Sequence, residues 1–364
     1  MSFENMRVLK LSNSDITEIP DLHGVPNLQE LLFNDCKSLI KIHESVGFRD
    51  KLKILDADGC TKLRSFPPIK LTSLEKLKLS FCGSLECFPE ILGKMENVTS
   101  LDIKYTPIKE LPSSIQNLTQ LQSIKLRGGG IIQLPNSIFG MKELRSFIVK
   151  CCRGLLLSKE NEGEEQMSSM VISNPVGFLD LSYSNISDEF LLRGLPMFAK
   201  VNELHLRGNV FTVLPACIKE LQLLTKVYLK FCDNLKKIRG IPPNLEKLCI
   251  RDCRSLRGLD LTPLLSCSEE CYVLRKYFEY DCGGLEGIPV PRLFEELDII
   301  LCKSLKVIDF TPPPACAREC RISSTLNFED CSDLEQIKGI PSNVGEFSAI
   351  DCLSSECRSM LLNK

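Results

Sequence analysis

The stretch Leu74-Glu-Lys-Leu-Lys-Leu-Ser-Phe-Cys-Gly-Ser-Leu85 arranges its leucines and one cysteine in the pattern LxxLxLxxCxxL. The same pattern returns at Leu224–Leu235, with Val227 and Cys232 at the matching positions. In a β-strand successive side chains point to opposite faces, so the two inner residues of LxL would point into one core. The pattern therefore predicts a short strand with one buried face, followed by a turn that begins near the cysteine.

The ninth position of this pattern can be followed along the whole chain. Fifteen copies occur, mostly 20–25 residues apart, with longer steps of 32, 29 and 29 residues. The ninth positions are Ser14, Cys36, Cys60, Cys82, Thr106, Gly129, Cys152, Ser184, Asn209, Cys232, Cys253, Cys282, Cys302, Cys331 and Cys352. A leucine-based strand at this period is the signature of leucine-rich repeats. We expect an α/β leucine-rich-repeat solenoid of about fifteen repeats, curved, with a parallel sheet on the concave face and mostly irregular or short helical convex segments.

Cysteine fills ten of the fifteen ninth positions, out of nineteen cysteines in the chain. A thiol is a weak hydrogen-bond donor that packs like a small apolar group, so it suits a position that turns inward and meets loop carbonyls. We expect these ten thiols to be buried and reduced. A ladder of reduced thiols favours a reducing compartment, so we expect a cytoplasmic protein, or one shared between cytoplasm and nucleus.

The segments between the strands indicate how the chain is organised. Many copies close with an apolar residue and proline, as in Ile19-Pro20 and Leu111-Pro112, which favours an extended return path over a long helix. Residues 158–174 form an acidic run without periodicity, which we interpret as a mobile loop. We expect one continuous solenoid, with repeats 1–7 in residues 1–157 and repeats 8–15 in residues 175–364.

The charge balance and hydropathy restrict the class of partner. The chain has 45 Lys and Arg against 47 Asp and Glu, a net charge of −2, which gives no general attraction to nucleic acid or an anionic membrane. No apolar run approaches the roughly 18 residues of a spanning helix. The repeats begin within six residues of Met1, so we expect no signal peptide. We therefore expect a protein partner, and neither nucleic acid nor a membrane.

Catalytic and cofactor-binding motifs are not found in the sequence. The three histidines, His23, His43 and His205, do not lie in a catalytic or metal-ligand spacing. The chain has no GxxxxGK[ST] phosphate-binding loop and no GxSxG nucleophile motif. We expect no enzymatic activity, no cofactor and no metal site.

One group of cysteines could still hold a metal ion. Cys267 and Cys271 form a CxxxC pair that returns 49 residues later as Cys316 and Cys320. Four thiolates can bind zinc, but two repeats separate the pairs by roughly 10 Å, with no further ligand. We favour packing within a duplicated convex insert, with zinc or a redox role as the alternative.

The residues expected to face solvent on the strands suggest a binding surface. Repeats nine to twelve are basic and aromatic, with Cys249 in the same row, while acidic residues such as Asp56, Asp58, Glu296 and Asp298 flank them. Arg and aromatic residues dominate binding energy at interfaces, and local charge speeds encounter. We predict a partner-binding site on the concave face, formed by His205, Arg207, Lys226, Tyr228, Lys230, Lys247, Arg251 and Lys276. The alternative is a solvated sheet face without a partner.

Several segments resemble a known family. These are Phe3-Glu-Asn-Met-Arg-Val-Leu-Lys-Leu11, Ile42-His-Glu-Ser-Val-Gly-Phe48, Thr106-Pro-Ile-Lys-Glu-Leu-Pro112 and Ala349-Ile-Asp-Cys-Leu-Ser-Ser-Glu-Cys357. They are similar to the repeats of plant TIR-NB-ARC-LRR disease-resistance proteins of the tobacco N-like branch, over nearly the whole chain. The resemblance implies the sensor of an intracellular immune receptor, which recognises a pathogen effector or a guarded host protein and contributes to autoinhibition.

The chain departs from this family in lacking the TIR and NB-ARC domains. The family's NAD-cleaving and nucleotide-binding activities therefore cannot be assigned to any residue here, and these domains become expected partners within a full-length receptor. Two other classes stay open. A secreted repeat protein that binds microbial enzymes would need a signal peptide and paired terminal cysteines, and a substrate adaptor of a ubiquitin ligase would need an F-box segment upstream.

Overall fold

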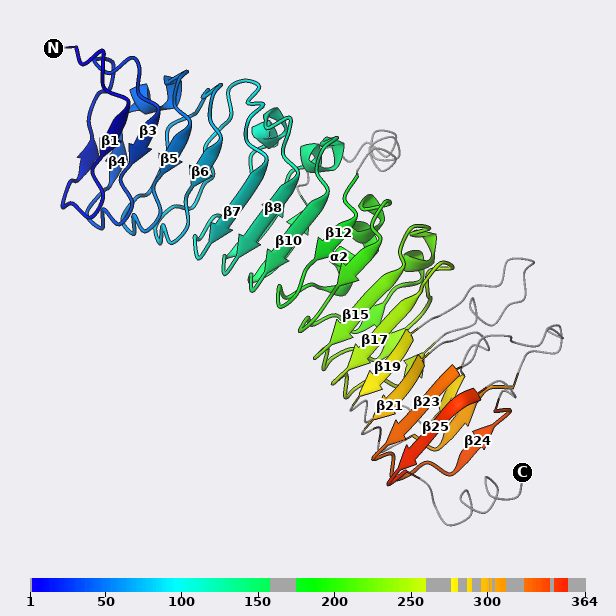
Figure 1. Ribbon diagram of the computed structural model, residues 1–364. Coiled ribbons are helices and arrows are strands. Elements are labelled where there is room, and N and C mark those ends of the chain that lie inside the picture. Colours follow the sequence, from blue (N-terminus) through cyan, green and yellow to red (C-terminus); the bar gives the residue numbers. More distant parts are fainter. Residues whose placement is uncertain are drawn as a thin grey trace. The chain divides into compact units, whose positions relative to one another are not determined.

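The computed structural model describes residues 2–157, 175–259, 276–280, 287–289, 296–300, 302, 305–311, 324–340 and 344–352. The chain divides into two compact units, Met1–Asp180 (unit 1) and Leu181–Lys364 (unit 2), which are described separately. In both units, short parallel strands follow one another in the order of the sequence (Figure 1). Each strand pairs with a strand of a neighbouring turn, as a solenoid requires.

Unit 1 carries two runs of parallel strands. The first consists of β1 Val8–Lys10, β3 Glu30–Leu32, β5 Ile54–Asp56 and β6 Lys76–Lys78. The second consists of β7 Ser100–Lys104, β8 Ser123–Arg127, β10 Ser146–Lys150 and β12 Phe178–Asp180. The register keeps apolar residues opposite one another, as with Leu31, Leu55 and Leu77, so that one continuous apolar row lies inside the turns.

Unit 2 continues the same design. Its strands are β13 Glu203–His205, β15 Lys226–Lys230, β17 Lys247–Arg251, β19 Lys276–Tyr280, β21 Glu296–Ile300, β23 Ser324–Glu329 and β25 Val344–Ile350. Leu204, Val227 and Leu248 are in register and buried. Over the described residues the two units thus contain fifteen such strands, each lying just before one of the ninth positions. The leucine-rich-repeat fold is confirmed.

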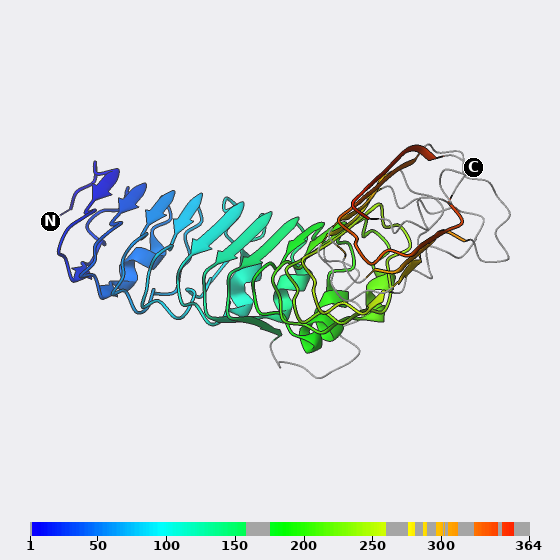
Figure 2. The ribbon, with the colours of Figure 1, turned by 90° about the horizontal axis from the view of Figure 1, so that it is seen from below.

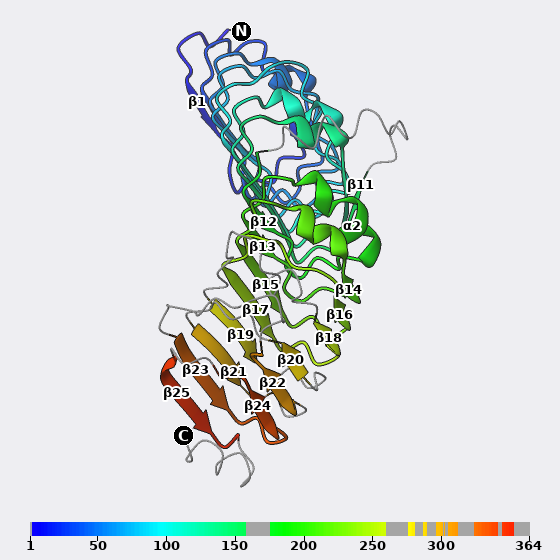
Figure 3. The same cartoon turned by 90° about the vertical axis from the view of Figure 1, so that its right-hand side faces the viewer.

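The return side of each turn contains short extended pairs. They are β2 Glu18–Ile19 with β4 Lys41–Ile42, β9 Ile131–Leu134 with β11 Gly154–Leu157, β14 Val213–Leu214 with β16 Lys237–Ile238 and β18 Gly258–Leu259, and β20 Gly287–Pro289 with β22 Val307–Asp309 and β24 Gln336–Lys338 (Figure 3). They agree with the extended return path that the proline positions predict.

Short helical turns also occur on the return side, and three of them directly follow a proline: η2 Ser113–Asn117, η3 Asn136–Gly140 and η5 Ala216–Glu220. The others are η1 Glu44–Phe48, the α-helix α2 Asp188–Arg193 and η4 Leu195–Met197. In unit 1 they lie on the side away from the long strands (Figure 2). Pro112 is extended and its carbonyl accepts a hydrogen bond from the N–H of Ile115 at 3.0 Å. A Pro-x-x-Ile sequence therefore closes a single 3-10 turn and buries the Ile, instead of starting a long helix.

In several turns the side chain of the ninth residue bonds to the preceding turn. The side chains of Cys60, Cys82 and Cys232 donate to the carbonyls of Phe33, Ala57 and Leu206 at 3.1, 3.2 and 3.2 Å. Each of these cysteines is buried, and each carbonyl belongs to the preceding turn. The expected role of the ninth residue as an inward-facing donor is confirmed at these positions.

Asn209 is also a ninth residue, and its side chain makes more hydrogen bonds to the backbone than a thiol can. Its amide nitrogen donates to the carbonyls of Leu181 and Leu206, both at 2.9 Å. Its amide oxygen accepts from the backbone N–H groups of Ser184 and Ile186, both at 3.1 Å. The side chain is 3% exposed, so all four bonds form out of contact with water.

Other expectations about the chain are tested only in part. Nine of the ladder cysteines are buried and lie outside any disulfide bond: Cys36, Cys60, Cys82, Cys152, Cys232, Cys253, Cys302, Cys331 and Cys352. Cys282, the two CxxxC pairs and the acidic run 158–174 lie outside the described residues. The organisation as one continuous solenoid stays a prediction. Within the described ranges, no helix has the length and apolar character needed to span a membrane.

We predict that the ladder thiols resist alkylation in the native protein. Burial raises the pKa of Cys60 and of Cys82 to about 12, and the reactive thiolate is disfavoured accordingly. Mass spectrometry after iodoacetamide treatment at neutral pH should show labelling of the exposed Cys87 and Cys151, with Cys60 and Cys82 unlabelled until denaturant is added. Rapid native labelling of Cys60 or Cys82 would contradict the assigned repeat register.

We predict that Asn209→Ala destabilises unit 2 by about 3 kcal/mol, because four buried hydrogen bonds to the backbone are lost. Urea unfolding followed by circular dichroism measures the change. Asn234→Ala serves as the matched control, since this exposed side chain makes one long hydrogen bond, at 3.5 Å to the carbonyl of Val210. Equal losses for the two variants would show that the buried network does not hold successive turns together.

Candidate protein-binding surface

Neighbouring strands of unit 2 carry the residues predicted to bind a partner. His205 ends β13 and Arg207 lies two residues further along the chain, while the others lie in β15, β17 and β19. The register places Tyr228 between His205 and Cys249. Lys276 begins β19 in register with Lys247, but its side chain is outside the described part of the structure. We call the outward-facing side chains of β13, β15 and β17, together with Arg207, the basic strand face.

Tyr228 is the centre of the basic strand face. Its ring centroid lies 4.3 Å from that of His205. The ammonium groups of Lys247 and Lys230 lie 5.4 and 6.0 Å from the same ring, within the range of cation–π attraction. The structure therefore brings four of the predicted residues into one cluster, in which the aromatic ring holds two cations near the surface.

Glu203 is the carboxylate that faces this cluster from β13. Its side chain lies 2.7 Å from Nε2 of His205 and 3.4 Å from Nζ of Lys226. Burial alone would raise the pKa of Glu203, but the hydrogen bonds from His205 and Lys226 outweigh it and hold the pKa below its usual range. Lys226 thus offsets the charge of the one carboxylate on the face, His205 adds a hydrogen bond to it, and the remaining cations dominate the surface.

Arg207 lies at the edge of the face in an arrangement that the sequence did not predict. Its guanidinium carbon is 5.3 Å from the centroid of the Tyr183 ring and 4.8 Å from that of Phe231. Both aromatic residues lie in the turn that comes after a strand. The inward–outward alternation of strand residues therefore does not predict their positions. An aromatic residue directly before the ninth position is the signal that could have found them.

Two expectations about the surrounding charges need correction. Cys249 was expected to face solvent, but it is 7% exposed and burial raises its pKa, against the opposing effect of nearby cations. Asp56 was expected on the open face of unit 1, but it is 8% exposed and bonded to Lys78 at 2.8 Å. The short side chains of both lie beneath longer neighbours, which strand alternation alone does not reveal.

The acidic residues of unit 2 remain on the strand face. Glu296 and Asp298 lie in β21 at half-buried positions that alternate with buried Leu297 and Ile299. Along the order of pairing in unit 2, the surface changes from basic on β15 and β17 to acidic on β21. The expected acidic flank is confirmed for this strand.

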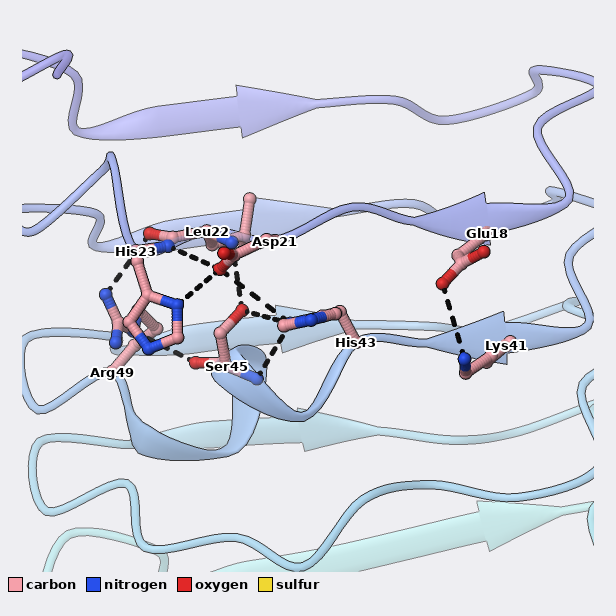
Figure 4. Close-up of polar contacts among 8 residues, drawn as sticks. All are labelled: Glu18, Asp21, Leu22, His23, Lys41, His43, Ser45 and Arg49. Atoms are coloured by element: carbon pink, nitrogen blue, oxygen red, sulfur yellow. Dashed lines mark hydrogen bonds and ion pairs between the residues drawn. The ribbon is translucent and has the colours of Figure 1, made fainter. Parts of the chain in front are cut away.

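A second polar cluster lies in unit 1, between the return segments of the first two turns (Figure 4). Asp21 accepts hydrogen bonds from the backbone N–H and the Nδ1 of His23, at 2.9 and 2.5 Å. The backbone bond from His23 holds the pKa of Asp21 below its usual range. Nδ1 of His43 lies 2.9 Å from Oγ of Ser45 and 3.7 Å from the carboxylate of Asp21.

This group contains a serine, a histidine and an aspartate but does not form a catalytic triad. In a triad, one ring nitrogen contacts the serine while the other contacts the aspartate. Here Nδ1 of His43 faces both, and Ser45 is 1% exposed with its hydroxyl bonded to the N–H of Leu22 at 2.9 Å. Arg49 adds bonds to the carbonyls of Leu22 and Ser45 at 3.2 and 3.0 Å. The cluster fastens successive turns together. Among the described residues, no three His, Cys, Asp or Glu side chains are arranged to hold a metal ion.

Comparison with known proteins identifies the family. The sequence model described as "Disease resistance protein RPS4B-like, leucine-rich repeats" matches residues 70–268, which is more than half of the chain. The chain belongs to this family. Leucine-rich-repeat modules of this kind are typically non-catalytic and serve in contacts with other proteins.

Individual relatives agree with this assignment. The chain is 29% identical to TMV resistance protein N of Nicotiana glutinosa over 68% of this chain and 26% of the relative. It is 31% identical to Protein SUPPRESSOR OF npr1-1, CONSTITUTIVE 1 of Arabidopsis thaliana over 70% of this chain and 15% of the relative. Among solved structures, YopM from Yersinia enterocolitica WA-314 is 18% identical over 95% of this chain and 78% of that chain, with a TM-score of 0.37.

This disease-resistance repeat module therefore spans about a quarter or less of the length of these two resistance relatives. The shared part is the repeat region, as the resemblance of the strand motifs implied. A role in plant defence follows from the family, while the partner and the mode of signalling are matters for proposal.

We predict that Glu203→Gln lowers the stability of unit 2 by about 0.5–1 kcal/mol at neutral pH, as for partly exposed ion pairs. The pKa of Glu203 is lower in the folded protein than in the unfolded chain, so its ionised form stabilises the fold at pH values above the unfolded pKa. This stabilisation is lost as the pH falls through the folded-state pKa. Urea unfolding at several pH values should show a gap between wild type and variant that closes below about pH 4.

Glu220→Gln is the control, because Glu220 is exposed in η5 and makes no ion pair with any described residue. A gap that persisted at acidic pH, or one that also appeared in the control, would contradict the role of the Glu203 ion pairs.

Proposed function

We propose that this chain is the sensor of a plant immune receptor and recognises a pathogen effector or a guarded host protein through the basic strand face. The same module would contribute to holding the receptor inactive when that partner is absent. The observation that carries the proposal is the cluster of cations around Tyr228 on the strands of a disease-resistance repeat module. His205, Arg207, Lys226, Tyr228, Lys230, Lys247, Arg251 and Lys276 are the proposed partner-binding residues.

The energetics of this face suit recognition of a folded protein. Tyr and Arg provide large contact areas and several hydrogen bonds, and such residues carry most of the binding energy at interfaces. Lys226, Lys230 and Arg251 add positive charge that would raise the rate of encounter with an acidic partner. The ring of Tyr228 already orders two lysines, so fewer rotamers would be lost on binding.

Family membership favours this proposal over the two alternatives from the sequence. The relatives are resistance proteins of plants, whereas a secreted inhibitor or a ubiquitin-ligase adaptor would be expected to match other repeat families. The TIR and NB-ARC domains of the relatives' family would be further partners within a full-length receptor. Cytoplasmic localisation, with access to the nucleus, is part of the same proposal and is supported by the ladder of free thiols.

We predict that Lys226→Glu, Lys230→Glu and Arg251→Glu together abolish capture of the partner without unfolding the protein. All three side chains reach solvent from strands whose inner residues are unchanged, so the protein should stay folded, with a melting curve lowered only by loss of the Lys226–Glu203 ion pair. Quantitative mass spectrometry of proteins captured from infected plant tissue measures the effect.

The matched control reverses Lys236, Lys237 and Arg239, which are exposed residues on the return side of unit 2. A partner should be captured by the wild type and by this control but lost from the strand-face variant. If both triple variants capture the same proteins as the wild type, recognition does not use the basic strand face.

A further inference from the structure

The residue directly before the ninth position adopts a left-handed backbone in many turns. At Asn13, Asp35 and Asp252 the φ angles are 58°, 59° and 53°, and Asn and Asp tolerate this conformation. At Tyr183 and Phe231 the same backbone, with φ of 55° and 54°, carries large aromatic side chains. A bulky residue in this region is a marked exception and strains the backbone.

The strain at Tyr183 and Phe231 is not offset by burial of their rings. Tyr183 is 42% exposed and Phe231 is 38% exposed. An exposed aromatic residue held in a strained conformation suggests a functional role for the ring, since asparagine would suit the backbone better.

Gly208 keeps the Tyr183 ring in place. A Cβ atom at Gly208 would lie 2.2 Å from two carbon atoms of that ring, and Gly208 itself has φ of +64°. The ring therefore lies flat on the glycine backbone, in a position that any other residue at 208 would displace. One face of Tyr183 is fixed by the fold, and Arg207 lies over the ring at the edge of the turn.

Arg207 is held between two rings while its hydrogen-bonding edge stays open. Tyr183 and Phe231 contribute cation–π attraction from two other turns, at 5.3 and 4.8 Å from the guanidinium carbon. Among the described residues, the contacts found for this guanidinium are the two rings, and no carboxylate or carbonyl accepts a hydrogen bond from it. Arginine held flat in this way presents parallel N–H groups in the geometry that a carboxylate or phosphate accepts.

The cations beside Arg207 indicate which anion this site fits. The N–H of Gly208 donates to the carbonyl of Lys230, and Lys230 is in register with Arg251. Arg207, Lys230 and Arg251 thus form a row across adjacent strands, with a spacing of about 4.8 Å. An extended acidic segment that crosses the strands could place successive carboxylates along the whole row, whereas a single phosphate is too small to span all three cations.

We propose that Tyr183, Arg207 and Phe231 form a clamp that binds a carboxylate side chain from an acidic segment of the partner protein. This inference rests on the proposed function and adds the chemistry of the partner. The two rings fix the plane of the guanidinium before binding, so the clamp selects a planar anion by its geometry as well as its charge. Lys230 receives the neighbouring carboxylate of the same segment, while Arg251, whose Nε is bonded to Asp252 at 3.2 Å, adds positive charge to the row.

Fluorescence anisotropy with a labelled hexaglutamate peptide, on the purified chain at fixed ionic strength, tests the clamp. Arg207→Lys keeps the charge but removes the planar fork, and it should weaken binding by about tenfold. Arg257→Lys is the matched control: this exposed arginine bonds to the carbonyls of Arg254 and Leu256 at 3.1 and 3.2 Å, and binding should be unchanged. Equal affinity of the wild type and Arg207→Lys would overturn the clamp, since charge alone would then explain binding.

A second variant separates binding from a purely structural role of the rings. Tyr183→Asn with Phe231→Asn relieves the strained backbone, so the urea midpoint should stay the same or rise while affinity for hexaglutamate falls severalfold. A lower midpoint with unchanged affinity would show that the rings only stabilise the fold. A phosphoserine peptide of equal charge that binds more tightly, with the advantage lost in Arg207→Lys, would assign the site to phosphate and overturn the carboxylate proposal.

The clamp and the proposed function fail in different ways. The peptide assay needs no natural partner, so it reports on the clamp even if the strand face recognises nothing in plant tissue. Conversely, loss of partner capture in the charge-reversal variant combined with normal capture by Arg207→Lys would retain the recognition surface and reject the clamp.

Discussion

In the described part of the chain, several turns depend on a side chain from the next turn to satisfy their backbone. The strand of one turn ends in carbonyls that face the interior, where water cannot reach them. Cys82, Cys232 and Asn209 supply the missing donors from the following turn, as thiol or amide groups. Because an unpaired buried carbonyl is costly, this requirement fixes both the period of the repeat and the parallel register of the strands. The leucines fill the space that this framework encloses.

A fixed interior leaves the outer strand positions free to differ. Leu204, Val227 and Leu248 are constrained by the core, while His205 and Tyr228 between them are constrained only by their neighbours on the surface. The surface contacts around Tyr228 and Glu203 are individually weak, but they order side chains that would otherwise be mobile. A rigid scaffold with a partly ordered charged surface reduces the entropy lost on binding, which is an advantage in a recognition module.

The features that depend on the buried core could be predicted from the sequence. The strands and the ninth positions follow from apolar alternation and the period, and both agree with the structure. The surface was harder to predict. Asp56 and Cys249 have the right strand position but lie beneath longer side chains, and Tyr183 and Phe231 lie in a turn whose left-handed φ is set by the backbone path. The His43 cluster joins residues 21–49 through return segments, where the repeat pattern carries little information.

The spacing of aromatic residues at the left-handed position, directly before the ninth residue, determines which contacts their rings can make. In unit 1, Phe81 and Tyr105 occupy the left-handed position in consecutive turns, and their rings stack with centroids 5.4 Å apart. In unit 2, Tyr183 and Phe231 are two turns apart, and Gly208 occupies the left-handed position between them. Two turns leave roughly 10 Å, which is too far for rings to stack but suits a guanidinium between them. The same left-handed position therefore has two outcomes. Where aromatic residues occupy it in consecutive turns, their rings stack on each other; where a glycine lies between two aromatic residues, their rings can hold an arginine.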